Sequence, residues 1–190
     1  MTIAIDPGRY DAAPRFPAYL ESVTQHGELW QGMYRTAVIA PELVERMRRN
    51  SQEVRLLVLS EDWCSDCFSA IPLIARLADA AGTELRVLAR DANPDLMDAH
   101  LTSGTRSIPV VMVLGPDHQV RAWWGPRPAP LQRWYRDEPP SPARSRKKRA
   151  WYARDRGRTT LTELLETVER AVRRSGSDRA RPEEAPSSRV

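Results

Sequence analysis

The chain has 190 residues, of which 41% are hydrophobic, enough for one well-cored domain with extensions but too few for two full domains. No apolar run approaches the roughly 20 residues that cross a bilayer, and the N-terminal residues lack the basic and apolar regions of a signal peptide, so we expect a cytoplasmic protein without a membrane partner. The formal charge of +4 does not describe a uniformly basic nucleic-acid binder, because residues 144–158 hold eight Lys or Arg against one Asp, and the remainder is mildly acidic.

Two amphipathic helices are predicted near the N-terminus. Apolar residues recur at helical spacing over residues 16–26, and Gly27 interrupts this pattern. A second apolar face begins at Pro41, a residue suited to the first turn of a helix. We therefore expect residues 1–51 to form a helical extension that packs on the core.

Strands and helices alternate in the predicted core, residues 52–137. The predicted helices are 64–81 and 94–101. The predicted strands are 54–59, 84–89, 109–114 and 119–124. The first two strands and the long helix between them form a βαβ unit, whose strands should be parallel. A five-residue turn joins the last two strands into an antiparallel hairpin. The expected fold class is α/β, with a mixed sheet covered by helices on both faces.

The remaining residues are predicted to be a linker, a helix and a tail. Prolines and cations over residues 138–158 are typical of an exposed basic linker. An apolar stripe predicts a C-terminal helix over residues 159–174 that docks on the core. Residues 175–190 have the composition of a disordered tail.

Both cysteines of the chain, Cys64 and Cys67, follow Trp63 at the predicted start of the 64–81 helix. On the first turn of a helix this spacing gives the Cα separation that a disulfide needs. The helix N-terminus favours negative charge and so lowers the pKa of the first thiol. We therefore expect Cys64 to be the nucleophile and Cys67 the resolving thiol of a redox pair.

Metal binding and structural burial are the alternatives for this cysteine pair. A closed zinc site usually has four ligands, whereas the chain has two cysteines and three histidines without ligand spacing. A zinc or iron–sulfur site would need a second chain, so no metal is expected. The third possibility is a pair of buried, inert thiols. In a reducing compartment a redox role is favoured over both.

Residues 52–126 resemble the thioredoxin-fold family, in particular bacterial thioredoxin-like proteins with a Trp-Cys-Ser-Asp-Cys motif. The resemblance rests on the apolar strand, WCSDC at 63–67 followed by Pro72, DANP at 91–94 and GTRSIP at 104–109. It implies a thioredoxin-like mixed sheet flanked by helices on both faces, elaborated here by the N-terminal helices and the C-terminal helix.

The resemblance also implies a substrate groove. The bond between Ile108 and Pro109 would be cis and would lie beside the sulfurs, the backbone of Ile108 would pair with an extended substrate, and Trp63 would shield one flank. From the residues alone, Pro109 could equally be an ordinary proline at the start of a strand.

The sequence departs from the family pattern around the dithiol. Val58 and Val87 stand where family members bury an aspartate and its lysine partner. Ser65 and Asp66 lie between the cysteines, and Asp62 lies two residues before Cys64. Negative charge beside a thiol disfavours its thiolate. We therefore expect these three residues to tune the pair toward a reductant.

The predicted function is thiol–disulfide oxidoreduction, in which the cysteine pair reduces or exchanges protein disulfides. The substrate would be a protein or small-molecule disulfide, a reductase or small thiol would donate electrons, and no cofactor beyond the redox-active disulfide is expected. The alternative is a non-catalytic thioredoxin-fold adaptor for a protein or nucleic-acid partner. Cations mix with Trp151 and Tyr152 in residues 144–158, but such runs are usually solvated, and nucleic acid is not the expected partner.

Overall fold

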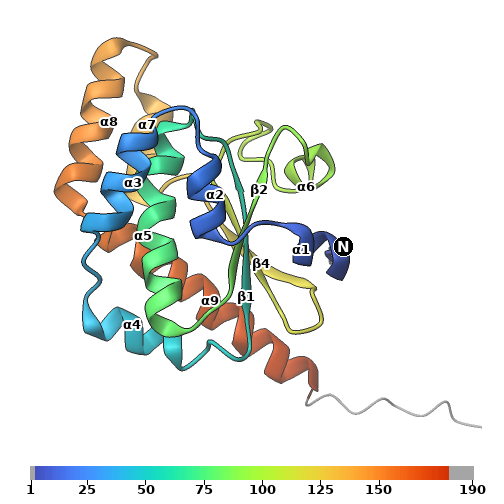
Figure 1. Ribbon diagram of the computed structural model, residues 1–190. Coiled ribbons are helices and arrows are strands. Elements are labelled where there is room, and N and C mark those ends of the chain that lie inside the picture. Colours follow the sequence, from blue (N-terminus) through green and yellow to red (C-terminus); the bar gives the residue numbers. More distant parts are fainter. Residues whose placement is uncertain (1–2, 180–190) are drawn as a thin grey trace, which may run out of the picture.

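A four-stranded mixed sheet forms the centre of the chain, of which the computed structural model describes residues 3–179 (Figure 1). Its order is β2-β1-β3-β4. The central strands pair antiparallel, β1 also pairs parallel with β2, and β3 pairs antiparallel with β4. The predicted mixed sheet and its terminal hairpin are confirmed. The strands are β1 (Arg55–Ser60), β2 (Leu85–Ala89), β3 (Val110–Leu114) and β4 (Val120–Trp124).

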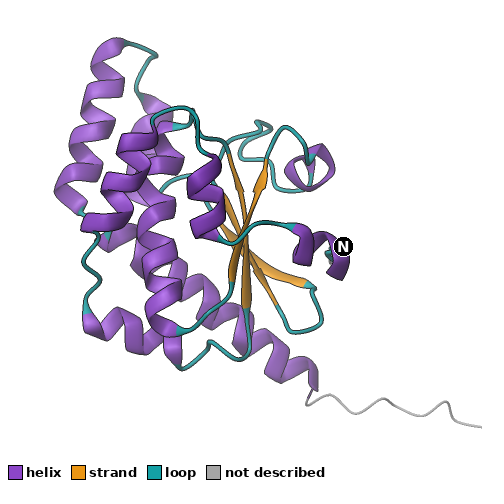
Figure 2. Cartoon of the chain, viewed as in Figure 1, coloured by secondary structure: helices purple, strands orange, loops and turns teal. Residues whose placement is uncertain are grey.

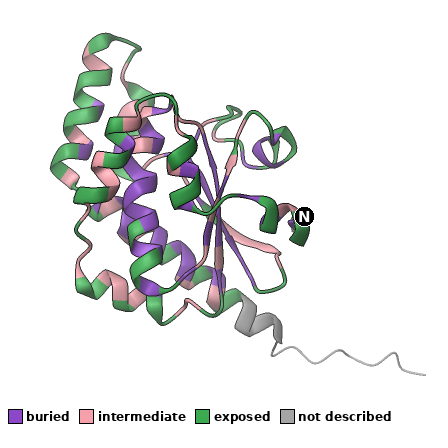
Figure 3. Cartoon of the chain, viewed as in Figure 1, coloured by how far each residue is buried: buried purple, intermediate pink, exposed green. Residues whose placement is uncertain are grey.

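The burial of the two central strands, β1 and β3, explains why their sequences are continuously apolar. All five residues of β3, and all of β1 beyond Arg55, are buried. Figure 3 shows this burial through the middle of the sheet. A strand can be apolar at every position only where other elements cover both of its faces. Figure 1 shows one side of the sheet covered by α3 (Gly27–Thr36), α5 (Ser65–Ala81) and α8 (Pro142–Asp155), and the other by α1 (Pro7–Ala12) and α6 (Pro94–Asp98).

The N-terminal extension contains four helices, where the sequence predicted two. A proline in the first turn starts three of them, because proline lacks the amide hydrogen that a helix interior needs. Gly27 begins a helix and does not merely interrupt one. The four helices are α1 (Pro7–Ala12), α2 (Phe16–Ser22), α3 (Gly27–Thr36) and α4 (Pro41–Arg48). Helices α3 and α4 pack on α5 (Ser65–Ala81).

Helix α5 follows β1 directly and completes the βαβ unit. It is the most buried of the helices around the sheet, with Pro72 inside it and Gly82 ending it in the left-handed conformation, φ 72°. Such a residue is the usual helix terminator, because glycine has no Cβ to clash there. Two shorter helices follow in the core, α6 (Pro94–Asp98) and α7 (Ala129–Asp137).

The predicted exposed linker is wrong for most of its length. Residues 142–155 form helix α8 (Pro142–Asp155), which the side chain of Ser141 caps. Lys148 and Tyr152, one turn apart, are buried against the core. Because the helix is otherwise polar, its sequence carries no apolar stripe that would have revealed it. Figure 2 shows this helix as a regular element at the border of the molecule.

The predicted C-terminal helix is present and longer than expected, α9 (Arg158–Arg179). Its apolar stripe is buried at Leu161, Leu164, Leu165 and Val168 and half-buried at Val172, and the helix packs on β4 and β3. Residues 175–179 of the predicted tail are therefore helical, and residues 180–190 lie outside the described residues. Within residues 3–179, none of the helices has the length and apolar character of a membrane span.

Gly125, directly after β4, lies against the loop that precedes β3. Its φ is 134°, and a Cβ there would lie 2.1 Å from the carbonyl oxygen of Pro109. A side chain would therefore meet both an unfavourable backbone conformation and a rigid backbone atom. Gly125 lets the end of β4 approach the backbone that leads into the centre of the sheet.

We expect Gly125→Ala to lower the free energy of unfolding by at least about 2 kcal/mol. Gly32→Ala is the matched control, because nothing lies within 4 Å of the added Cβ inside α3. This control should leave stability unchanged or raise it by up to about 1 kcal/mol. Urea unfolding of both variants measures the difference, and equal stabilities would show that the close approach at Gly125 is not required.

Candidate dithiol site

The two cysteines lie at the N-terminus of α5, directly after β1. Cys64 is the N-cap residue and Cys67 belongs to the first turn. The cysteines approach each other to 3.3 Å and neither is in a disulfide. The strand fixes the start of the helix, and the helix then holds both thiols on one turn. This is the proximity that a reversible disulfide requires.

The surroundings make the two thiols chemically different. A hydrogen bond from Cys67 lowers the pKa of Cys64, and the amides of Cys67 and Asp66 act in the same direction against burial and the Asp66 charge. Burial, followed by the hydrogen bond and charge of Cys64, raises the pKa of Cys67 well above its ordinary value. Cys64 is 7% exposed and Cys67 is fully buried. Cys64 is thus the thiol that can ionise and react first.

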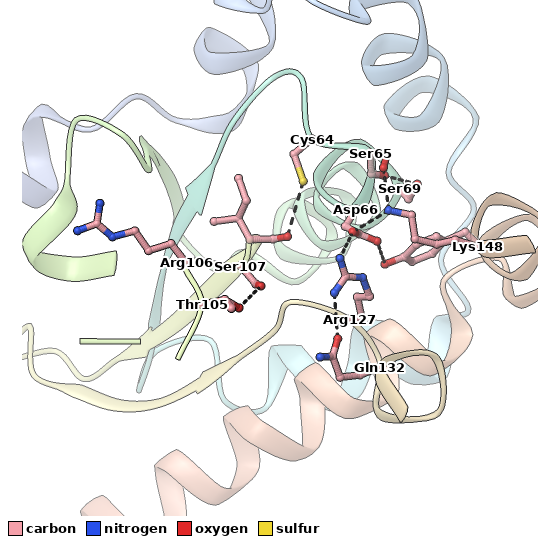
Figure 4. Close-up of polar contacts among 12 residues, drawn as sticks. Cys64, Ser65, Asp66, Ser69, Thr105, Arg106, Ser107, Arg127, Gln132 and Lys148 are labelled. Atoms are coloured by element: carbon pink, nitrogen blue, oxygen red, sulfur yellow. Dashed lines mark hydrogen bonds and ion pairs between the residues drawn. The ribbon is translucent and has the colours of Figure 1, made fainter. Parts of the chain in front are cut away.

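The loop before β3 lies opposite Cys64. The Cys64 Sγ donates a hydrogen bond to the Ile108 carbonyl oxygen at 3.6 Å (Figure 4). The bond between Ile108 and Pro109 is cis, and both residues are buried. Trp63, 42% exposed, stands beside the thiol with the Arg90 guanidinium 5.0 Å from its ring centre. Cys64, Trp63 and Ile108 line one cavity of about 330 Å³, whereas Pro109 does not contribute to its lining.

Asp66, between the cysteines, is the centre of a buried ion cluster. Its carboxylate accepts hydrogen bonds from Arg127 at 2.6 Å, Lys148 at 2.9 Å and the Tyr152 hydroxyl at 3.0 Å. The Lys148 ammonium also donates to the Ser65 hydroxyl at 2.8 Å (Figure 4). Burial, and then the Asp66 charge, raises the pKa of Tyr152 well above its ordinary value, so the phenol stays a donor. We refer to Asp66, Arg127, Lys148 and Tyr152 as the Asp66 cluster.

Of the residues predicted to tune the dithiol, Asp66 acts on Cys64 in the expected direction, because its charge raises the pKa. The hydrogen bond from Cys67 outweighs this charge, so the net pKa of Cys64 is lowered. The Asp62 carboxylate accepts bonds from Thr24 and Gln25 in the N-terminal extension. Although burial opposes it, these bonds lower the pKa of Asp62. The sequence showed the acidic residues but not the donors that face them.

Two hydroxyl groups near Cys67, those of Ser60 and Tyr19, were also not identified from the sequence. Ser60, the buried last residue of β1, lowers the pKa of Cys67 through a hydrogen bond, although burial is the larger, opposing effect. The Tyr19 hydroxyl of α2 donates to Ser60 Oγ at 3.2 Å. Meanwhile Val58 and Val87 are register partners and both are buried. The polar groups near Cys67 thus include Ser60 of β1 and Tyr19 of the N-terminal extension, whereas the sheet interior at Val58 and Val87 is apolar.

Lys148, Tyr152 and Arg127 have no local signature in the sequence. One signal could have led to the first two: Ser141-Pro142 is a typical N-cap and first residue of a helix. With that start, Lys148 and Tyr152 share a helix face.

Within the described residues, no group of three or more His, Cys, Asp or Glu side chains could hold a metal ion.

Comparison with known proteins agrees with this architecture. A family model described as thioredoxin matches residues 13–142, more than half of the chain. No curated protein matches. A crystal structure of a protein of unknown function from Pseudomonas aeruginosa is similar, with 20% identity, TM-score 0.69, and 87% of this chain and 98% of that chain covered. An HIV epitope scaffold is similar at 19% identity, TM-score 0.66, and 84% and 94% coverage. These structures support the fold alone.

We expect Asp66→Asn to lower the free energy of unfolding by about 3 kcal/mol, because it leaves the buried Arg127 and Lys148 without their shared carboxylate. The double variant Asp66→Asn, Lys148→Met should recover part of this loss, since it removes one of the two cations. Chemical denaturation of wild type, both single variants and the double variant forms a double-mutant cycle. Additive effects would contradict a coupled cluster.

We expect iodoacetamide to modify Cys64 at a lower pH than an ordinary thiol, whose pKa is about 8.5. A lowered pKa leaves more thiolate at a given pH, whereas Cys67 should stay unmodified over the same range. Cys67→Ala should move the Cys64 profile to higher pH, because it removes the hydrogen bond that lowers the pKa most. Mass spectrometry of peptides alkylated across a pH series measures both profiles. A wild-type profile at or above that of a free thiol would contradict the assignment.

Proposed function

The chain belongs to the thioredoxin family, and from this premise and its paired thiols we propose that it is a thiol–disulfide oxidoreductase. The observation that carries the proposal is the difference between Cys64 and Cys67. Cys64 has a lowered pKa and lines a cavity, whereas Cys67 is buried, has a raised pKa and lies 3.3 Å away. A nucleophile and a resolving thiol need these opposite properties.

The proposed reaction has two exchange steps. The Cys64 thiolate attacks one sulfur of a substrate disulfide, forms a mixed disulfide and releases the other sulfur as a thiolate. Cys67 then gives up its proton and attacks the Cys64 sulfur, which forms the internal disulfide and releases the second substrate thiolate. The substrate gains two electrons and the dithiol loses two. A dithiol protein or two molecules of a small thiol would return the pair to the reduced state.

The substrate groove proposed here consists of Trp63, Ile108 and Pro109. The Ile108 carbonyl already accepts a hydrogen bond from the Cys64 thiol. When Cys64 ionises, this carbonyl loses its donor and becomes available to the backbone amide of an extended substrate. The exposed ring of Trp63 would cover the other side of the reacting sulfurs.

In this proposal, the redox state of the partners determines the direction of net electron transfer. The acidic residues alone favour a reductant, but the hydrogen bond from Cys67 outweighs the Asp66 charge, and the net pKa of Cys64 is lowered. We therefore propose exchange with protein or small-molecule disulfides in a cytoplasmic thiol pool. The reaction as proposed requires no organic cofactor, because the cysteine pair itself carries the electrons.

Reduction of a protein disulfide by limiting dithiothreitol tests the proposal. Wild type should accelerate the reaction by at least about tenfold over background, and Cys64→Ser should remove the acceleration, since it deletes the nucleophile. Cys67→Ser should accumulate a mixed disulfide on Cys64, visible by mass spectrometry. Far-ultraviolet circular dichroism checks that each variant folds. Equal rates for wild type and Cys64→Ser would leave the non-catalytic adaptor as the function.

A further inference from the structure

The cavity beside Cys64 is lined by more cations than carboxylates. Arg90, Arg106, Arg127 and Lys148 contribute to its wall, and the one carboxylate in that lining belongs to Asp66. Its volume of about 330 Å³ lies at the lower end of the range for small-molecule sites. Figure 4 shows Arg106 on one side of Cys64, with its guanidinium directed away from the sulfur, and Arg127 with Lys148 on the other. Cationic side chains therefore border the cavity on both sides of the reacting sulfur.

The Asp66 cluster leaves part of its positive charge unbalanced. One carboxylate faces both the Arg127 guanidinium and the Lys148 ammonium. A third cation joins them around Tyr135, whose ring centre lies 4.0 Å from the Arg127 guanidinium carbon, 3.5 Å from that of Arg144 and 5.4 Å from the Lys148 ammonium. Cations over an aromatic face gain some stabilisation, but the ring carries no net charge to neutralise them. An anion in the cavity would supply that charge.

On the opposite wall, two arginines contribute to the lining, and their carboxylate partners lie outside it. Arg90 pairs with Asp91 at 2.7 Å, and Arg106 pairs with Asp98 at 2.6 Å. The Arg106 and Asp98 side chains are each at least half exposed, and such exposed pairs contribute little stability. Arg106 can therefore donate to an anion at small cost. Arg90 is held over the Trp63 ring, next to the thiol.

We propose that this cavity selects small disulfides that carry carboxylate groups near the sulfur. The inference rests on the proposed oxidoreductase function and specifies its substrate class. The exchange step is unchanged: Cys64 bonds to one half of the disulfide, and the other half leaves as a thiolate that also bears a carboxylate. The leaving group thus carries two negative charges, and the cations on both walls stabilise it as it forms. Arginine suits this task because its fork of donors matches a carboxylate.

Three symmetrical disulfides of similar length test the selection: dithiodipropionate, bis(2-hydroxyethyl) disulfide and cystamine, which are dianionic, neutral and dicationic. The measurement is kcat/KM for each, divided by its uncatalysed rate with the same thiol. We expect the dianion to exceed the neutral compound by about tenfold, with the dication lowest, and the difference to shrink as salt increases. Cys64-dependent turnover without a preference for the dianion would overturn the inference and leave the proposed function standing. Absence of turnover with all three would count against the function itself.

Arg106→Gln should reduce the preference for the dianion over the neutral disulfide, measured as the ratio of their kcat/KM values, by about threefold or more. Arg15→Gln is the matched control, because Arg15 is also an exposed arginine with one carboxylate partner, Glu84, and it does not line the cavity. The control should keep the wild-type preference. A preference that survives Arg106→Gln, or that falls equally in the control, would contradict the assignment to this cavity.

A stoichiometric measurement separates charge selection from turnover. Iodoacetate and iodoacetamide have similar size, but the first is an anion and the second is neutral. The ratio of the rates at which they alkylate Cys64 therefore measures selection by charge. We expect their ratio to exceed that of a free small thiol, and Arg106→Gln to lower it toward the free-thiol value, while Arg15→Gln does not change it. A wild-type ratio at or below the free-thiol value would overturn the inference even if the enzyme reduces disulfides.

Discussion

The buried carboxylate of Asp66 is the constraint around which the dithiol site is built. A charge removed from water must be paired and hydrogen-bonded, or its desolvation would cost several kcal/mol. Because Asp66 lies between the two cysteines, its donors must come to the dithiol. They arrive from two distant segments: Arg127 from the residues after β4, and Lys148 with Tyr152 from α8. The charge at the centre of the motif thus orders a segment whose composition is that of a solvated linker.

The polar groups near the dithiol come from several elements of the fold. Val58 and Val87 fill the sheet interior near the dithiol with apolar side chains. Ser60, the last residue of β1, and the first turn of α5 act directly on the thiols. The N-terminal extension supplies Tyr19, which donates to Ser60, and α8 supplies two donors to Asp66. The added helices therefore do more than cover the core, because they supply partners to groups that act on the cysteine pair.

The sequence predicted the elements whose patterns are local. Continuous apolar runs identified the central strands, and the cysteines after Trp63 identified the start of α5, since burial and helix termini leave marks within a few residues. The Asp66 cluster could not be found this way. Lys148 is 82 residues from Asp66, and a polar helix that buries one face through a charged residue has the composition of a linker. The resemblance to a known family located the dithiol and its opposing loop, but gave no account of α8.

The basic segment shows how one run of charge can serve two surfaces. Lys148 is buried at the dithiol, whereas Arg146 and Arg149 of the same helix are exposed to solvent. A single cation would suffice to pair Asp66, yet two charged donors bind it, and a third cation shares the Tyr135 ring with them. Like charges held this close repel one another, so their arrangement costs stability unless a negative charge enters between them. In the proposed reaction, the Cys64 thiolate and an anionic substrate would bring negative charge into the neighbouring cavity, and this would link the packing of α8 to the chemistry of the dithiol.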